Sequence, residues 1–338
     1  MDAINEVSNV LSNPKNILIT SHRNPDGDAI GSSLAMALWL KRRGHRVMVA
    51  FPSEYPPIYN WMPAIEEVEI YDVDPEPIVS FIKHLEVSVI LDYNSLSRID
   101  KLGALFAEKD LYTILIDHHL FPDPIGDYVL SDTTASSTCE LVYQFFKSLE
   151  PDRSIDHALA ECLYTGILTD TGGFQYATSP ALFRAVAELQ EIGIETTQIH
   201  NLVFNSLEEK SLRLLGHCLS SRMEIIPEFK TGIIFLNKHD FTVFGIQRGD
   251  TEGIVNYLLK LRDVHMAIFI RQQPSIIKIS FRSKGDFSVE EIAKTYFNGG
   301  GHRNAAGGYT KMGLADTLDL IKSILPKYKE SLIKPILV

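Results

Sequence analysis

The chain of 338 residues contains few cysteines and no long hydrophobic run. Its three cysteines, Cys139, Cys162 and Cys218, are too few and too far apart for a disulfide framework or a paired-cysteine zinc site. No apolar stretch approaches the roughly 18 residues that a membrane-spanning helix requires. The acidic N-terminal stretch also lacks the basic and apolar regions of a signal peptide. We therefore expect a cytoplasmic protein with no membrane partner.

Basic residues are also in the minority. The chain has 32 Lys and Arg against 43 Asp and Glu, a formal net charge of −11. Long duplex nucleic acid is bound through many phosphate contacts, which this balance argues against. The acidic excess lies in residues 1–222, with 16 basic and 31 acidic residues, whereas residues 223–338 have 16 and 12. This asymmetry suits metal ions in the first part and a small anion in the second, although ordinary surface variation explains it equally well.

The length predicts two domains. In the first 130 residues, helical stretches alternate with short apolar runs at 16–22, 46–51, 87–94 and 112–119. Continuous apolar strands separated by helices indicate a parallel sheet with helices on both faces. Strand–turn–strand patterns at 223–238 and 266–284 indicate a smaller α/β domain with a mixed sheet. We expect an α/β protein with domains at 1–194 and 223–338, joined by a helical linker at 195–222.

Polar residues that are able to bind metal ions follow three of the predicted strands. The carboxyl ends of parallel strands meet at one edge of a sheet, so these side chains should converge there. Two further candidates lie in the turn after the first strand, and another ends an apolar helical stretch beside two glycines. The six candidate ligands are His22, Asp26, Asp28, Asp92, His118 and Asp170.

Each candidate has a simpler explanation when it is taken alone. Asp26 and Asp28 also fit a helix cap, Asp92 fits a loop cap, and a histidine pair is usually a surface or core feature. Only the combination favours a metal centre. Two imidazoles and four carboxylates are too many for one cation and suit two cations that share a carboxylate. Without thiolates, the set favours Mn²⁺, with Mg²⁺, Co²⁺ and Fe²⁺ as alternatives.

Two metal ions about 3.5–4 Å apart are suited to phosphoester hydrolysis, because they activate water and neutralise charge on the attacking and leaving oxygens. The adjacent residues His118 and His119 point in different directions, so one can bind metal while the other faces substrate. Asp117 can orient one of the rings by accepting its second N–H.

A second cluster of polar and small residues lies in the C-terminal part. Gly299, Gly300 and Gly301 favour a turn whose backbone N–H groups bind an anion, with His302 and Arg303 as further donors. Arg282 follows the apolar run 277–281 and could hold a second phosphate. A glycine cluster alone is more often a flexible loop than a pocket, but the nearby Phe-Arg-Ser sequence favours a pocket.

These motifs resemble those of a known family. The stretches "SHRNPDGDAIGSS", "VILDYNSLSRI", "LIDHH" and "TGILTDTGGFQYATS" resemble the motifs of the DHH phosphoesterases. The C-terminal "FRSKGDFSVEEIAKTYFNGGGHRNAAGG" resembles the associated DHHA1 substrate domain. The similarity covers nearly the whole chain and is strongest to the bifunctional nanoRNase (oligoribonuclease) and pAp phosphatase branch.

The resemblance implies roles for individual residues. One Mn²⁺ would be held by His22, Asp26 and Asp92, and the other by Asp28, Asp92, His118 and Asp170, with Asp92 bridging. His119 would contact the scissile phosphate, Asp117 would support the histidines, and Arg98 would serve the phosphate or stabilise its loop. The substrate would also contact Arg282, Gly299, Gly300, Gly301, His302 and Arg303. Tyr93 and Asn94 depart from the family pattern and put details of substrate binding in doubt.

The resemblance also implies a Mn²⁺-dependent hydrolase that degrades short single-stranded RNA or DNA oligonucleotides to mononucleotides. It would also convert 3′-phosphoadenosine 5′-phosphate (pAp) to AMP. Two alternatives stay open: a phosphodiesterase for pApA or cyclic di-AMP, and a non-catalytic nucleotide sensor. The direction of chain attack, the metal used in the cell, and a monomeric or homodimeric state are not determined by the sequence.

Overall fold

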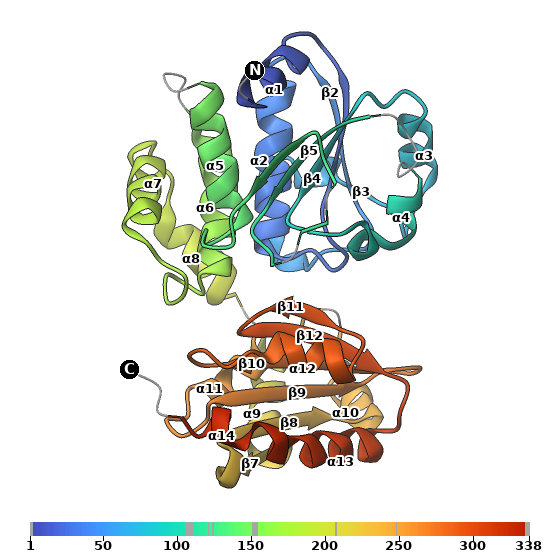
Figure 1. The fold of residues 1–338 in the computed structure, drawn as a ribbon, viewed down its shortest axis with the longest axis vertical. Coiled ribbons are helices and arrows are strands. Elements are labelled where there is room, and N and C mark those ends of the chain that lie inside the picture. Colours follow the sequence, from blue (N-terminus) through green and yellow to red (C-terminus); the bar gives the residue numbers. More distant parts are fainter. Residues whose placement is uncertain are drawn as a thin grey trace. The chain divides into compact units, whose positions relative to one another are not determined.

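The structure is a computed structural model that describes residues 3–105, 111–120, 122–123, 125–150, 155–206, 208–247 and 249–334 (Figure 1). The chain divides into two compact units, Met1–Ser206 and Leu207–Val338. The division falls within the segment 195–222, which we expected to connect the domains. Among the described residues, no helix is both long enough and apolar enough to cross a membrane.

The first unit is built on a sheet of six strands that all run parallel to their neighbours, in the order β3-β2-β1-β4-β5-β6. Four strands lie where the apolar runs predict them: β1 Asn16–Thr20, β2 Arg46–Phe51, β4 Val87–Leu91 and β5 Tyr112–Asp117. The sequence pattern missed β3 (Glu69–Ile70) and β6 (Tyr128–Ser131). These two edge strands are short and only partly buried, so they lack the continuous apolar run of a central strand.

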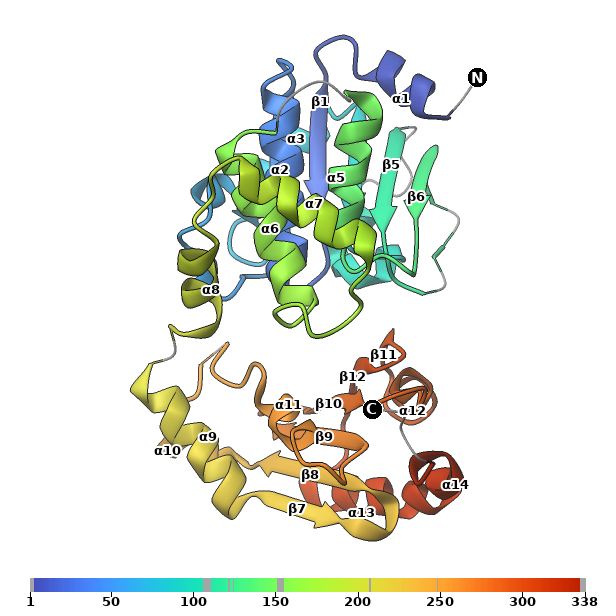
Figure 2. The same cartoon turned by 90° about the vertical axis from the view of Figure 1, so that its left-hand side faces the viewer.

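Helices cover both faces of this sheet (Figures 1 and 2). Alternate strand residues belong to opposite cores: Ile17 and Ile19 pack in one, and Leu18 packs in the other. The first core includes residues of α1 Ala3–Val10, α2 Gly27–Lys41, α5 Thr138–Leu149, α6 His157–Asp170, α7 Pro180–Glu191 and α8 Thr196–Phe204. The second includes residues of α3 Glu76–Ile82 and α4 Asp100–Ala104. The predicted parallel α/β fold is confirmed.

Two glycines allow α2 and α6 to pack closely. A Cβ atom at Gly31 of α2 would lie 2.5 Å from the backbone oxygen of Cys162 in α6. A Cβ atom at Gly166 of α6 would lie 2.8 Å from Oδ1 of Asp28 in α2. Larger side chains at these positions would push the helices apart. The close packing holds Asp28, at the start of α2, near the end of α6, where Asp170 lies.

The second unit contains a mixed sheet of six strands in the order β11-β12-β10-β9-β8-β7. Only β8 and β9 pair in parallel. Its strands are β7 Met223–Ile226, β8 Thr231–Leu236, β9 Met266–Gln272, β10 Ile277–Ser283, β11 Gly300–His302 and β12 Ala305–Thr310. Its helices are α9 Glu209–Ser221, α10 Lys238–Val243, α11 Ile254–Leu259, α12 Val289–Tyr296, α13 Leu314–Ile324 and α14 Lys329–Leu332.

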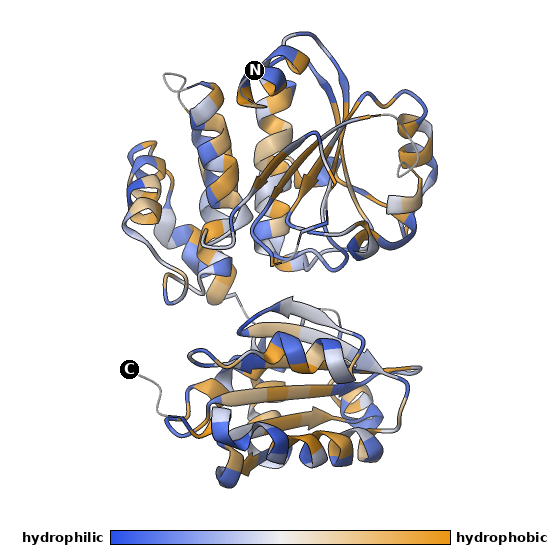
Figure 3. Ribbon diagram, viewed as in Figure 1, coloured by the Kyte–Doolittle hydropathy of each residue, from blue (hydrophilic) through white to orange (hydrophobic). Residues whose placement is uncertain are grey.

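Two cores hold this unit together. Residues of α12, α13 and α14 pack against one face of the sheet, and residues of α9 and α11 pack against the other. In Figure 3, β8 and β9 are mainly apolar, whereas the helices carry polar and apolar residues side by side. That pattern is typical of strands covered on both faces and of helices with one buried side. The predicted mixed-sheet α/β unit is confirmed.

Buried Asp240 joins α9 and α10 in this unit. Its carboxylate accepts hydrogen bonds from Nε and Nη2 of Arg222 at 2.9 and 2.8 Å. It also lies 2.9 Å from Nε2 of His217 and accepts the backbone N–H of Asn237 at 2.9 Å. Burial alone would raise the pKa of Asp240, but these hydrogen bonds outweigh burial and lower it. The carboxylate therefore stabilises the unit in its ionised form.

We expect Asp240→Asn to lower the free energy of unfolding by about 1–3 kcal/mol near neutral pH, because Arg222 loses a charged acceptor. A carboxylate whose pKa falls on folding stabilises the protein above its unfolded pKa of about 3.9. That contribution is lost as the pH falls through the folded pKa. In urea unfolding, the difference between wild type and variant should therefore shrink below about pH 4.

The control Asp319→Asn, at an exposed position of α13, should have little effect. An Asp240→Asn effect that is equally large at pH 3 and pH 6 contradicts this account.

Candidate metal centre

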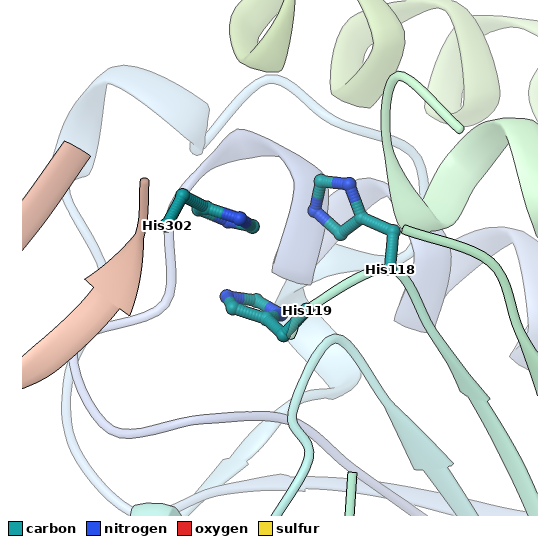
Figure 4. A group of neighbouring side chains, drawn as sticks. All are labelled: His118, His119 and His302. Atoms are coloured by element: carbon teal, nitrogen blue, oxygen red, sulfur yellow. The ribbon is translucent and has the colours of Figure 1, made fainter. Parts of the chain in front are cut away.

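Three neighbouring strands of the first sheet end at the candidate centre. His22 lies two residues after β1, Asp92 comes directly after β4, and Asp117 is the last residue of β5. Since β1, β4 and β5 are adjacent and parallel, these residues lie at one edge of the sheet. His118 and His119 follow β5 at the same edge (Figure 4). The residues that follow these strands therefore lie together at one edge of the sheet, as the parallel strand order requires.

The first group of potential ligands consists of His22, Asp26 and Asp92. Nε2 of His22 lies 3.3 Å from Oδ2 of Asp92 and 3.9 Å from Oδ2 of Asp26. Asp26 is also the N-cap of α2, because its Oδ1 accepts the backbone N–H groups of Asp28 and Ala29. The cap and the metal-ligand interpretations are therefore compatible, since each uses a different carboxylate oxygen.

The second group surrounds His118. Its Nε2 lies 3.3 Å from Oδ2 of Asp170, 3.6 Å from Oδ1 of Asp92 and 3.9 Å from Oδ2 of Asp28. Asp170 is the last residue of α6. All six candidate ligands thus fall into two groups that share Asp92.

Asp92 has the position of a bridging carboxylate. Its Oδ2 faces His22 of the first group, and its Oδ1 faces His118 of the second. The residue is almost completely buried, with 2% of its surface exposed. Its backbone φ is 63°, a left-handed conformation that is uncommon for residues other than glycine. Backbone strain of this kind concentrates at functional sites, where the surrounding structure holds it in place.

In each of the three imidazoles of the centre, Nδ1 lies within hydrogen-bond distance of a protein oxygen. Nδ1 of His22 lies 3.0 Å from the backbone oxygen of Arg23, and Nδ1 of His118 lies 3.3 Å from that of Ala135. Nδ1 of His119 lies 2.7 Å from Oδ1 of Asp117. Each Nδ1–H then donates to an oxygen, which leaves Nε2 for a metal ion or a substrate.

The rings of the two adjacent histidines point in different directions. Their ring planes cross at 75° with the centroids 5.1 Å apart (Figure 4). Nε2 of His118 faces the carboxylates of the second group, whereas the ring of His119 is fixed by Asp117. The predicted support by Asp117 is therefore directed to His119.

The donors fit divalent cations. Two ligand atoms that are each about 2.1 Å from one ion and in adjacent positions lie about 3.0–3.5 Å apart. The shortest nitrogen–oxygen separations in the two groups, both 3.3 Å, fall in that range. Carboxylate and imidazole donors without a thiolate suit Mn²⁺, Mg²⁺, Fe²⁺ or Co²⁺ better than a structural zinc site.

Electrostatics also favour cations at this edge. Burial, reinforced by the charge of Asp92, raises the pKa of Asp28 to about 7 and that of Asp117 to about 6. Burial lowers the pKa of His118, but the carboxylates of Asp170, Asp92 and Asp28 outweigh it and raise the pKa to about 9. Protons on these groups thus compensate for carboxylates that would otherwise repel each other. Divalent cations would replace those protons.

The structure adds one residue that the sequence analysis missed, Thr138 at the start of α5. Its Oγ1 donates to Oδ1 of Asp92 at 3.0 Å, and its backbone N–H donates to Oδ2 of Asp28 at 2.6 Å. The backbone N–H of Cys139 donates to Oδ1 of Asp28 at 2.9 Å. The N-terminus of α5 therefore holds two carboxylates of the centre. The only sequence signal was a Ser-Ser-Thr run at a helix start, which commonly serves as a simple cap.

Other predicted residues are placed as follows. Arg98 is partly buried in the 3₁₀ helix Leu96–Ile99, and its charge contributes, after burial, to the lowered pKa of His119. Tyr93 is completely buried, and its hydroxyl lies 2.7 Å from Oγ1 of Thr20. Tyr93 is therefore part of the core. Asn94 donates to the backbone oxygen of Leu120 at 2.6 Å.

The predicted residues of the second unit lie mainly on three neighbouring strands. Arg282 of β10 and His302 of β11 both pair with Ala305 of β12, so they lie in one row across the sheet. Arg303 lies in the turn that follows β11, with 60% of its side chain exposed, and its Nη1 is 3.8 Å from Asp286.

The glycines of this unit differ from the expected turn. Gly300 and Gly301 are in β11, which pairs with β12. A Cβ atom at Gly299 or Gly301 would lie 2.0 or 2.5 Å from a backbone oxygen of the neighbouring strand, whereas Gly300 has open space. Close chain packing therefore requires two of the three glycines. A sequence pattern cannot separate this requirement from a ligand-binding turn.

The fold and the site define a two-unit α/β protein with a carboxylate–imidazole centre suited to two divalent cations. The chain belongs to the DHH family. Residues 16–167 match the DHH family N-terminal domain, and residues 240–328 match the DHHA1 domain. The resemblance seen in the sequence motifs is confirmed.

Relatives across the family share most of the chain. A protein named bifunctional oligoribonuclease and PAP phosphatase NrnA, from Thermus thermophilus, is 30% identical, with 92% of this chain and 88% of that protein covered. Cyclic-di-AMP phosphodiesterase PdeA from Listeria monocytogenes is 25% identical, with 94% of this chain and 48% of that protein covered. The crystal structure of an exopolyphosphatase-related protein from Bacteroides fragilis is 35% identical and superposes with a TM-score of 0.94, with 98% of each chain covered. These relationships identify the chain as a hydrolase of the phosphoesterase type.

We expect Thr138→Val to weaken Mn²⁺ binding by roughly 10-fold, because the carboxylate of Asp92 loses a hydrogen bond and supporting hydrogen bonds typically contribute 10- to 100-fold to metal affinity. Valine keeps the shape and the backbone N–H, so the contact with Asp28 is retained. Thr138→Ser keeps the hydroxyl and should bind Mn²⁺ nearly as well as wild type. Calorimetric titration of the metal-free proteins with Mn²⁺ measures these affinities. Equal Mn²⁺ affinities of the valine and serine variants would show that the hydroxyl does not position Asp92.

Proposed function

We propose that the chain is a two-metal phosphoesterase that hydrolyses short RNA oligonucleotides to mononucleotides and pAp to AMP. The placement of Asp92, with one oxygen facing each of two separate His–Asp groups, carries this proposal. Support for the substrates comes from the Thermus relative, whose name states both activities and whose length this chain nearly spans.

The two groups define how the cations would be held. His22, Asp26 and Asp92 would hold one ion, and Asp28, Asp92, His118 and Asp170 would hold the other. We propose Mn²⁺ as the preferred ion, with Mg²⁺, Co²⁺ or Fe²⁺ as alternatives. When bound, the ions supply an activated water and neutralise charge on the phosphate. The strained backbone of Asp92 and its hydrogen bond from Thr138 fix the shared carboxylate before substrate arrives.

The remaining residues position the substrate. His119, oriented by Asp117 through Nδ1, presents Nε2 to the scissile phosphate. Arg98 adds positive charge beside His119 and serves the same phosphate. In the second unit, Arg282, Gly299, Gly300, Gly301, His302 and Arg303 would bind the rest of a short nucleotide. We expect no binding of long duplex nucleic acid, because the net charge is −11.

Cyclic di-AMP hydrolysis is the alternative activity. The Listeria relative carries that name, but it is less similar and this chain covers only 48% of its length. A non-catalytic sensor is disfavoured because all six candidate ligands lie in the two groups. The cytoplasm stays our proposed location, since the three cysteines are free and buried.

A substrate panel tests the proposal. With Mn²⁺, the protein should hydrolyse RNA dinucleotides and pAp faster than pApA or cyclic di-AMP, and a chelator should abolish hydrolysis. Asp92→Asn should lower kcat/KM roughly a thousandfold or more, because both ions lose a ligand. Asp127→Asn is a matched control at the start of β6, where its carboxylate accepts the Thr113 N–H, and it should retain activity.

Two results would contradict the proposal. Good hydrolysis of cyclic di-AMP without activity on pAp or dinucleotides would assign the alternative activity. Mn²⁺-dependent hydrolysis that survives Asp92→Asn would show that the shared carboxylate is not needed, which contradicts the two-metal assignment.

A further inference from the structure

Positive charges gather on one face of the second sheet. Arg271 of β9 lies directly opposite Lys278 of β10 in the antiparallel register. Arg282 is on the same face of β10, four residues after Lys278. Like charges in opposite positions of neighbouring strands destabilise a sheet. An anion bound to the face would reduce the repulsion between these charges.

Arg271 has an unusual environment for a cation. Its Nη1 donates to Oγ1 of Thr251 at 3.0 Å, and its Nη2 donates to Oγ of Ser280 at 3.2 Å. Its Nε is buried without an acceptor. In the described parts of the chain, the guanidinium donates to hydroxyls and forms no ion pair, and burial lowers its pKa. The charge of the exposed Glu252 opposes this lowering of the pKa.

The group around Arg271 consists of hydrogen-bond donors that lack acceptors. The hydroxyls of Thr251 and Ser280 accept from Arg271, and neither donates to an acceptor among the residues that the structure describes. The guanidinium also has more N–H groups than the two hydroxyls accept. A phosphate brings several acceptor oxygens and a negative charge, and a guanidinium binds it through paired hydrogen bonds.

The sheet leaves space beside these donors. Gly307 of β12 lies opposite Ser280, and a Cβ atom at Gly307 would meet no atom closer than 3.7 Å. Tyr309, opposite Lys278, is 43% exposed. Ser280 is itself partly exposed, whereas its neighbours Ile279 and Phe281 face the core. The donor group is therefore at an open part of the sheet face and is not sealed in the core.

We propose that Arg271, with Thr251 and Ser280, binds a phosphate group of the nucleotide, and that Lys278 and Arg282 add positive charge to this position. The choice of a nucleotide as ligand rests on the proposed function. The expected affinity for a phosphate follows from the hydrogen-bond donors around Arg271 alone. The bound phosphate is one that is not hydrolysed. For pAp this is the 5′-phosphate, which the product AMP retains.

Binding to the full-length, metal-free protein tests this inference, because a chelator prevents turnover. In calorimetric titrations, Arg271→Met should weaken pAp binding by roughly 10- to 100-fold, the effect of losing a charged hydrogen bond, and leave adenosine binding unchanged. Arg271→Lys should be intermediate, because it keeps the charge without the paired donors. The matched control Arg213→Met, at an exposed position of α9, should bind pAp like wild type. Wild-type pAp affinity in Arg271→Met would overturn the inference.

Thermal unfolding separates this role from a structural one. Without ligand, Arg271→Met should unfold at or above the wild-type temperature, because it removes a partly buried charge that lacks a carboxylate partner. Inorganic phosphate should raise the midpoint of wild type and Arg213→Met but not of Arg271→Met. A destabilised Arg271→Met that still responds to phosphate would overturn the inference.

The unfolding measurements with inorganic phosphate also separate the proposed anion site from the proposed function. If wild type hydrolyses neither pAp nor RNA dinucleotides, the proposed function fails. The phosphate response of wild type against Arg271→Met then still decides whether Arg271 forms an anion site.

Discussion

The mutual repulsion of buried carboxylates at one edge of the first sheet is the constraint on which the rest of the structure depends. Asp28 and Asp92 are each at most 2% exposed, Asp26 lies close to His22, and Asp170 lies close to His118. In the absence of cations, protons must compensate for this charge. A pair of divalent cations would satisfy the same carboxylates and would supply the chemistry that we propose for the site.

The fold positions these groups through its strand order, a helix N-terminus, close helix packing and one unusual backbone conformation. The parallel order of β1, β4 and β5 brings the strand ends together, and the N-terminus of α5 donates two backbone N–H groups to Asp28. Gly31 and Gly166 allow α2 and α6 to pack closely. The left-handed backbone at Asp92 turns its carboxylate between the two histidines. Each feature costs conformational freedom or strain, and together they organise the site before any ligand binds.

The sequence predicted the four central strands of the first unit and the edge at which their polar residues gather, because apolar runs that end in His22, Asp92 or His118 obey a simple topological rule. It did not predict Thr138, since a hydroxyl at a helix start has no signature beyond a cap. The glycines at 299–301 were assigned to a turn because glycine content alone does not distinguish a turn from closely packed strands. Arg271 went unnoticed within an apolar run, because its lack of an acidic partner is visible only in three dimensions.

Anomalous X-ray diffraction from crystals grown with Mn²⁺ tests the central claim most directly. The account predicts two manganese peaks about 3.5–4 Å apart, one beside His22 and Asp26 and the other beside His118 and Asp170, with the carboxylate of Asp92 between them. A single peak, or peaks away from Asp92, would contradict the shared-carboxylate centre.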